Sequence, residues 1–443
     1  MSTYLFALVD GGGTVPPELA AARRLVERGH VVTVLAEDSM APDVRATGAT
    51  YRPWVEAPNR PDRRPEHDPY RDWEVSSPLK LFDRLLDLQF IGPARGYIAD
   101  VDAAVAERRP DLVVCSQFAF GAMTAAEAAG IPFDVLMPNI YLLPAPGMTP
   151  IGSGTRPARG PLGRTRDRMT RAVMQRVWDK GRGRLNEIRQ ECGLPPVRHF
   201  MDQARAARRH LVMTSPDFDF PGRLPDNARY VGPVLDDPTW SGSEAWTAPA
   251  GTDPLVLVSL SSTFQDHEAT LQRIVDAMGT LPVRAVVTTG PALEPGSITA
   301  APNVTVVAAA PHRQVLAEAA AIVTHGGHGT VVKALAAGIP MVVLPHGRDQ
   351  ADNAVRVNER GAGVTLKRDA GAGAIAGAVR TVLDDPGYRE AAGRLGAAIR
   401  RDAAGSTLVD ELEAIGADRA ISGGGRSSAP GRRCDLATSA TGA

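Results

Sequence analysis

Cysteine is scarce in this chain of 443 residues, which contains only Cys115, Cys192 and Cys434. The three residues lie far apart and form neither a CxxC motif nor a cysteine–histidine spacing. We therefore expect no disulfide framework and no zinc site. Reduced thiols in a cytoplasmic protein are the corresponding expectation.

A long apolar run is also missing. The apolar stretch at the N-terminus, residues 4–9, ends at Asp10. It is too short for the core of a signal peptide and far too short to span a bilayer. We therefore expect a cytoplasmic protein that does not insert into membranes.

Net charge is nearly absent, because 49 lysine and arginine residues face 50 aspartate and glutamate residues. No overall field would attract the chain to nucleic acid or to an anionic membrane, so we expect neither as a partner. A small, roughly neutral partner fits this balance better. The composition leaves the oligomeric state open, a homodimer included.

Short apolar runs alternate with helical patterns along most of the chain, which is typical of strand–helix–strand units on a parallel sheet. The length favours two domains, and the fold class is predicted to be α/β. The predicted strands are residues 4–9, 31–36, 111–116 and 133–138 in the first half, and 254–260, 283–289, 304–309, 321–325 and 341–345 in the second.

A stretch rich in Pro, Gly, Ser and Thr separates the two halves, and its composition predicts a linker. The predicted division is a first domain at 1–235, a linker at 236–253 and a second domain with C-terminal helices at 254–418. Residues 419–443 have almost nothing to bury, so we expect a disordered tail.

The segment THGGHGT, residues 324–330, places two histidines among three glycines at the end of a predicted strand. Residues 330–337 continue as a predicted helix that ends at Gly338. Such a turn points unpaired backbone N–H groups and the positive end of a helix dipole at whatever lies above it, and an anion is the natural occupant. The same turn also occurs without a ligand in α/β proteins.

The wider segment carries four motifs: APHRQVL at 310–316, THGGHGT at 324–330, AAGIPMVVLP at 336–345 and GRDQ at 347–350. In order and spacing they resemble the donor-binding signature of family-one glycosyltransferases of the GT-B fold, and the chain looks like the bacterial natural-product branch. With residues 7–29 and 258–263 the resemblance covers both halves. It implies two Rossmann-like domains across a cleft, the first for the acceptor and the second for the nucleotide sugar.

The resemblance also implies a UDP- or dTDP-sugar as co-substrate, with no metal and no other cofactor. Oriented N–H groups can stabilise the charge of a leaving diphosphate without a metal ion. The implied residues are Ser262, His325, Gly327, His328, Gly329 and Thr330 for the diphosphate, Asp349 and Gln350 for the sugar hydroxyls, and Ala310 and His312 for the nucleoside.

The acceptor side departs from the family pattern. Members usually carry a histidine in the loop after the first strand, as base for the acceptor hydroxyl, and an aspartate that orients it. Here Thr14 and Ser116 stand in these places. A neutral threonine is not a useful proton acceptor near pH 7. Three substitutes for the base remain open: Asp10 at the end of the first strand, His67 with Asp68, and Glu18.

Two of the substitutes have a simpler explanation as well. Asp10 is also explained by a side chain that stabilises a turn. Glu18 lies at the start of a predicted helix, residues 16–29, where a carboxylate suits the helix dipole. The predicted catalytic residues are Asp10, His67 and Thr14, the last because it occupies the position of the family's histidine.

Two further departures concern the nucleoside. Plant members stack a tryptophan on uracil where this chain has Ala309, and bind the ribose hydroxyls with a glutamate where this chain has Lys333. A dTDP donor lacks the ribose 2'-hydroxyl and would not need that glutamate. UDP and dTDP both remain open.

Aromatic residues, only 5% of the chain, gather in the first half, which predicts an apolar acceptor pocket there. The predicted function is inverting transfer of a sugar to an apolar, natural-product-like aglycone. Two alternatives are a catalytically silent sugar-nucleotide-binding partner protein and an NDP-sugar epimerase. The aromatics concerned are Trp54, Tyr70, Trp73, Phe82, Phe90, Phe118, Phe120 and Tyr141.

Overall fold

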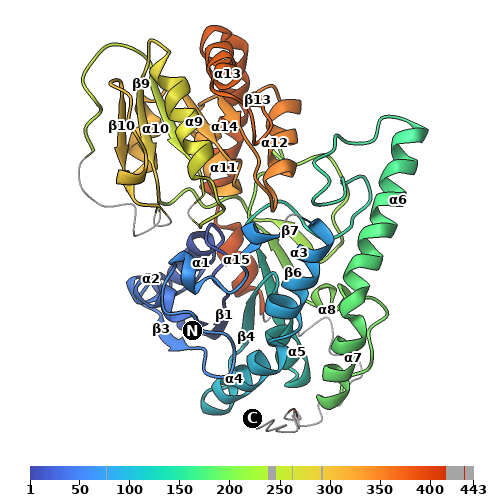
Figure 1. The fold of residues 1–443 in the computed structure, drawn as a ribbon. Helices are drawn as coiled ribbons and strands as arrows, with labels where there is room; N and C mark the ends of the chain where they lie inside the picture. Colours follow the sequence, from blue (N-terminus) through green and yellow to red (C-terminus); the bar gives the residue numbers. More distant parts are fainter. Residues whose placement is uncertain (76, 238–245, 262, 291–292, 416–433, 435–443) are drawn as a thin grey trace.

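The computed structural model describes residues 1–415 and Cys434, except residues 76, 238–245, 262 and 291–292. Figure 1 shows two α/β domains, the first coloured blue to green and the second yellow to orange. Each contains one parallel sheet with helices packed on its faces, so the predicted fold of two Rossmann-like domains is confirmed. Ser262 lies outside the described residues, as does the predicted disordered tail apart from Cys434.

The strands of the first sheet are β1 (Thr3–Ala7), β2 (Val31–Ala36), β3 (Thr50–Pro53), β4 (Leu112–Ser116), β5 (Phe133–Met137), β6 (Arg209–Val212) and β7 (Ala228–Tyr230). Their order in the sheet is β3-β2-β1-β4-β5-β6-β7, and all of the pairs are parallel. The four longest apolar strands were predicted. The shorter β3, β6 and β7 were missed because they lack a long apolar run.

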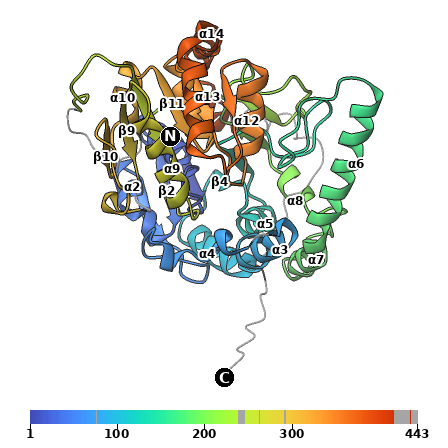
Figure 2. The same ribbon diagram turned by 45° about the horizontal axis from the view of Figure 1, so that its top comes forward.

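The helices of this domain are α1 (Val15–Glu27), α2 (Ala41–Ala46), α3 (Pro78–Leu85), α4 (Ala94–Glu107), α5 (Phe120–Ala128), α6 (Pro161–Trp178), α7 (Arg182–Glu191) and α8 (Asp202–Arg205). Helix α1 has proline in its first turn and buries Leu19 and Leu25 against the sheet. Helices α4 and α5 pack on the opposite face. Helices α6 and α7 lie along one side of the domain (Figure 2).

The second sheet contains β8 (Leu255–Ser259), β9 (Arg284–Thr288), β10 (Val304–Val307), β11 (Ala321–Thr324), β12 (Met341–Val343) and β13 (Gly363–Thr365), in the order β10-β9-β8-β11-β12-β13. The short edge strand β13 was not predicted. The helices are α9 (Glu268–Gly279), α10 (His312–Glu318), α11 (His328–Ala336), α12 (Gln350–Glu359), α13 (Ala372–Asp384) and α14 (Pro386–Ala403).

The strand order reverses once in each sheet, between β1 and β4 in the first and between β8 and β11 in the second. In open parallel sheets, ligands bind at this switch point, beyond the carboxyl ends of the strands. Residues that follow β1, β4, β8 and β11 all line one cavity between the domains. The two switch points therefore face the same space.

The last helix, α15 (Thr407–Glu413), belongs to the first domain in space. Leu408 and Leu412 are part of the hydrophobic core under β1, and the Tyr4 hydroxyl donates to the Leu412 carbonyl at 3.3 Å. The chain therefore crosses back after α14. This corrects the predicted second domain at 254–418, because a boundary read along the sequence cannot show which core a terminal helix joins.

The expectation of free cysteines is wrong for two of the three. Cys192 and Cys434 form a disulfide with their Cα atoms 4.2 Å apart, although 242 residues separate them in sequence. Cys115 is a free, buried thiol on β4. Spacing along the chain carried no information about this pair because tertiary structure brings them together.

Two features are absent from the described part of the chain. No helix there is both long and apolar enough to cross a bilayer. No group of three or more histidine, cysteine, aspartate or glutamate side chains there is arranged to hold a metal ion.

Buried polar contacts join the domains. The Asp352 carboxylate on α12 accepts the amides of Gly152 and Gly154 at 2.6 and 3.0 Å. The Arg356 guanidinium donates to Asp219 Oδ1 at 2.9 and 2.7 Å, and both side chains are almost fully buried. Each contact links α12 to a loop of the first domain, so the two domains are held together beside the cavity.

The buried pair predicts a large loss of stability when one partner is neutralised. Asp219→Asn leaves the Arg356 charge buried without its counter-charge, which costs about 3–5 kcal/mol. The exposed pair between Asp217 and Arg401, 3.1 Å apart, is the control. Asp217→Asn should cost under about 1 kcal/mol. Urea unfolding measures both free energies, and equal losses for the two variants would contradict the assignment.

Candidate active site

A cavity of about 1030 Å³ lies between the two domains. One wall consists of the loop after β1 and the residues that follow β4. The opposite wall consists of the turn between β11 and α11 and the residues that follow β12. The cavity therefore combines groups from both switch points.

The turn between β11 and α11 brings backbone amides to the cavity. Gly326 has a φ of 93°, a conformation that favours glycine. A Cβ on Gly327 would lie 2.6 Å from Nε2 of His325, so this ring packs directly on the backbone. The first hydrogen bond of α11 runs from the Val331 amide to the Gly327 carbonyl at 3.0 Å. The amides of residues 328–330 precede it and are available to an anion.

The two histidines of this turn are buried and neutral near pH 7. Burial lowers the pKa of His325 to about 3 and that of His328 to about 4. Nδ1 of His325 and Nε2 of His328 have no hydrogen-bond partner in the described residues. A neutral imidazole offers one donor and one acceptor. Both residues line the cavity.

Asp349 and Gln350 lie beside this turn, at the start of α12. The Asp349 carboxylate accepts from Asn353 Nδ2 at 3.0 Å, and burial raises its pKa. Gln350 Oε1 accepts the backbone amides of residues 346–347 at 2.6 and 3.1 Å, and its Nε2 donates to Gln265 at 3.1 Å. Both side chains line the cavity.

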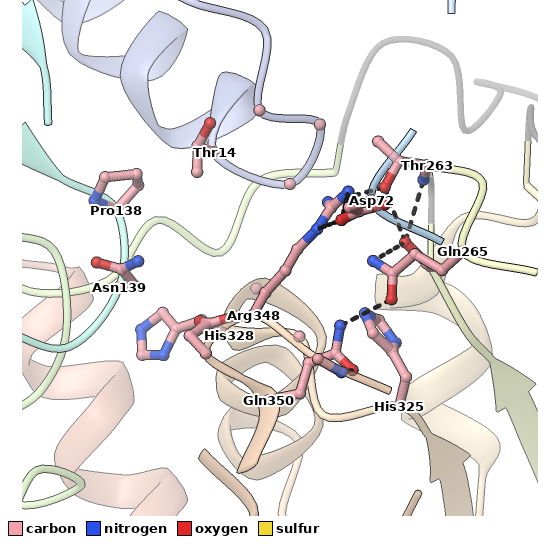
Figure 3. A pocket seen from close by; sticks show the side chains of 18 of the residues that line it. Thr14, Asp72, Pro138, Asn139, Thr263, Gln265, His325, His328, Arg348 and Gln350 are labelled. Atoms are coloured by element: carbon pink, nitrogen blue, oxygen red, sulfur yellow. Dashed lines mark hydrogen bonds and ion pairs between the residues drawn. The ribbon is translucent and has the colours of Figure 1, made fainter. Parts of the chain in front are cut away.

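Arg348 reaches across the cavity to the first domain (Figure 3). Its guanidinium donates to the Asp72 carboxylate at 3.0 Å and to Thr263 Oγ1 at 2.9 Å. The sequence interpretation missed Asp72 and Thr263 because 276 and 85 residues separate them from Arg348. The only sequence signal was the position of Arg348 within the GRDQ motif.

The predicted nucleoside end also lies in the cavity. Ala310 is buried, and His312 Nε2 lies 3.3 Å from Ser259 Oγ. Burial lowers the pKa of His312 to about 4. The Lys333 ammonium forms an ion pair with Asp237 Oδ1 at 3.1 Å, and Asp237 belongs to the segment that joins the domains. Ser259, Ala310, His312 and Lys333 line the cavity, and Asp237 does not.

Asp10 is held in a network of charges at the end of β1. Its carboxylate lies 3.1 Å from Arg60 and 2.8 Å from Arg63 and accepts the Gly12 amide at 2.9 Å. Burial opposes the negative charge, but the two guanidinium groups outweigh it and hold the pKa of Asp10 below its usual value. This geometry favours a structural role over proton uptake near neutral pH.

The other predicted acceptor-side candidates separate in space. Thr14 lines the cavity, as do Pro138 and Asn139 (Figure 3). His67 is partly exposed, contacts Asp62 at 2.7 Å and does not line the cavity. The structure therefore brings Thr14, but not His67, to the site. The neighbouring Asp68, by contrast, is buried and lines the cavity.

Aromatic side chains from the first domain form an apolar part of the cavity. Trp178 on α6 joins this lining, although the sequence interpretation missed it. Trp54 is instead a core residue that packs on Tyr97 and donates to the Leu8 carbonyl at 3.0 Å. Phe120 and Tyr141 are also buried outside the lining. The predicted aromatics that do line the cavity are Tyr70, Trp73, Phe82, Phe90 and Phe118.

Residues 183–406, about half of the chain, match the family described as UDP-glucoronosyl and UDP-glucosyl transferase. The chain belongs to this glycosyltransferase family. It is 32% identical over 425 residues to 4'-demethylrebeccamycin synthase of Lentzea aerocolonigenes, across 93% of this chain and 98% of that protein. It is 29% identical to the oleandomycin glycosyltransferase of Streptomyces antibioticus, across 91% and 88%.

A solved structure, the glycotransferase of kitacinnamycin, has the same fold as this glycosyltransferase. The TM-score is 0.72 at 26% identity, and the match covers 94% of this chain and 99% of that one. The resemblance to GT-B glycosyltransferases drawn from residues 310–350 is therefore confirmed. The roles of the individual site residues stay predictions.

Burial of the site histidines makes the stability of the enzyme depend on pH. The pKa of a histidine is 6.5 when unperturbed, but about 3 for His325 and about 4 for His328 in the folded enzyme. Between about pH 6.5 and 4 the unfolded chain binds more protons, so the free energy of unfolding falls as the pH decreases. We expect the melting temperature to fall over this window and His328→Asn to make the fall shallower. An NMR titration of His328 with a midpoint near pH 6.5 would contradict this.

Proposed function

We propose that this glycosyltransferase moves a sugar from a UDP- or dTDP-sugar to an apolar, natural-product-like aglycone, with inversion at the anomeric carbon. One observation carries the proposal. A single cavity has free helix-start amides on one wall and an aromatic lining on the other. The first wall suits a diphosphate, and the second suits an apolar acceptor.

The diphosphate lies against the start of α11 in this proposal. The amides of residues 328–330, the Thr330 hydroxyl and the neutral His325 ring donate hydrogen bonds to its oxygens. Charge accumulates on the diphosphate as its bond to the sugar breaks, and donors that are already oriented stabilise that charge without a metal ion. Asp349 and Gln350, beside the turn, bind sugar hydroxyls.

The opposed walls favour inversion. The diphosphate occupies the second domain's wall, and the acceptor occupies the first domain's wall. An acceptor hydroxyl or amine then approaches the anomeric carbon from the side opposite the leaving group. Attack in line from that side inverts the configuration of the carbon.

The acceptor surface supports the choice of an apolar aglycone. The six lining aromatics offer flat faces to a ring system. Gln117 and Asn139 also line the cavity, and each has a buried side-chain oxygen with no described hydrogen-bond partner, which suits polar groups on the acceptor. The relatives named for rebeccamycin and oleandomycin support a natural-product acceptor.

Nucleotide binding tests the donor site. We expect UDP or dTDP to raise the melting temperature in proportion to the logarithm of its excess over Kd. The monophosphates UMP and dTMP should give a smaller rise, because they lack the second phosphate that α11 binds. His325→Ala should abolish most of the difference between the diphosphate and the monophosphate. Equal shifts for the two in the wild-type protein would contradict the proposed diphosphate site.

Gly327→Ala tests the geometry of the turn. The added methyl group would lie 2.6 Å from the His325 ring and displace it. We expect a donor Kd at least about tenfold weaker by calorimetry, which corresponds to about 1.4 kcal/mol. Gly371→Ala is the control, because a Cβ there meets nothing within 4 Å. Unchanged affinity in Gly327→Ala would show that His325 does not contact the donor.

Product analysis separates transfer from its alternatives. Sugar transfer to one of a panel of apolar, ring-containing acceptors is the expected result. Donor binding with no transfer across a broad panel would favour the silent binding protein. Conversion of the NDP-sugar without any acceptor would favour an epimerase.

A further inference from the structure

Glu18 occupies an unusual position in the first turn of α1. It lines the cavity at the switch point between β1 and β4, although only 1% of the residue is exposed. A carboxylate that serves only the helix dipole would be expected in water. This one is instead enclosed beside Thr14 and Ser116, the residues that stand where the family usually has its histidine and aspartate.

The Ser116 hydroxyl is the polar group that interacts with the Glu18 carboxyl group. Neither of its oxygens makes a well-formed hydrogen bond within the described chain. Burial raises the pKa of Glu18 well above its usual value of 4.5, the Ser116 hydroxyl partly opposes this, and the negative charge of Asp10 adds to it. Buried polar groups are normally satisfied, and perturbed carboxyl groups in a cleft mark functional sites.

Among the described residues, no arginine, lysine or histidine forms an ion pair with Glu18. The nearby guanidinium groups of Arg60 and Arg63 bind the Asp10 carboxylate at 3.1 and 2.8 Å. The Cys115 thiol is the other titratable neighbour, and burial raises its pKa, so it is neutral near pH 7. Glu18 is therefore the carboxyl group here that can gain or lose a proton without breaking an ion pair.

Ser116 connects Glu18 with the cavity. Its Oγ accepts the Val9 amide at 3.2 Å, which leaves its own proton to be donated elsewhere. The interaction of this hydroxyl with Glu18 lowers the pKa of the carboxyl group, as expected for a donor to the charged form. Ser116 lines the cavity, so an acceptor group can approach its oxygen.

We propose that Glu18 takes up the proton of the acceptor substrate through the Ser116 hydroxyl. The acceptor O–H or N–H gives its proton to Ser116 Oγ, and Ser116 gives its own proton to Glu18. The acceptor atom bonds to the anomeric carbon, and the bond from that carbon to the diphosphate oxygen breaks, its electron pair leaving on the diphosphate. This proton path rests on the proposed transfer reaction.

Asp10 is the competing carboxylate at the same end of the sheet. To accept a proton it would have to give up charge pairing with two arginines, and its pKa lies below the usual value. A useful general base has a pKa near the working pH. The environment of Glu18 raises its pKa toward the working pH, whereas the environment of Asp10 lowers the pKa of Asp10 away from it.

The test compares Glu18→Gln with the wild-type enzyme. We expect kcat to fall at least about a hundredfold, the donor Kd to stay unchanged, and the acidic limb of the pH–kcat profile to disappear. Ser116→Ala should lower kcat with the same unchanged donor Kd. Glu127→Gln, which changes a carboxylate paired with Arg189 outside the cavity, should keep the wild-type profile.

Stability gives a second readout that needs no acceptor. Folding raises the pKa of this carboxyl group. Its contribution to the free energy of unfolding therefore falls as the pH rises above the pKa that the group has in the unfolded chain. The melting temperature of Glu18→Gln relative to wild type should therefore increase from pH 5 to pH 8, and a constant difference would overturn the proposal. Wild-type kcat with an intact acidic limb in Glu18→Gln would overturn it as well. Failure of the proposed function is distinct, because then the wild-type enzyme itself transfers no sugar.

Discussion

The parallel direction of the strands determines where each functional group of this glycosyltransferase lies. The described strand pairs of both sheets are parallel, so the strand ends that follow β1 and β4 lie on one edge and those that follow β8 and β11 on another. Because the domains place these edges opposite each other, one cavity receives both sets of loops. Residues far apart in sequence, such as Asp10 and His325, therefore line the same cavity.

Burial gives the two walls different electrical properties. On the second domain's wall, His325 and His328 are neutral because they are buried. The amides at the start of α11 provide a positive potential there without a full charge. On the first domain's wall, two arginines pair with Asp10, whereas no arginine in the described part of the chain pairs with Glu18. In the proposed reaction, stabilisation of the leaving anion and uptake of the proton therefore take place on opposite walls of the cavity.

Contacts across the cavity hold these walls together. The ion pair between Arg348 and Asp72 crosses the cavity itself, and the buried pair between Arg356 and Asp219 lies beside it. Helix α15 adds a covalent connection, since the chain leaves the second domain after α14 and packs under β1. These links oppose separation of the domains, so the substrates meet groups whose distances are set by the folded chain.

The sequence alone was sufficient for the α/β class, for nine of the strands and for membership of the glycosyltransferase family, because apolar periodicity and the motifs of residues 310–350 are local properties. The turn around His325 could be predicted for the same reason, since strand, glycines and helix follow one another directly. Only the tertiary structure decided the rest. The burial of Glu18, the contact of Arg348 with Asp72, the Cys192–Cys434 pair and the return of α15 depend on which distant segments pack together. The reactivity of a residue depends on its solvation and its contacts, and these cannot be inferred from the residues next to it in sequence.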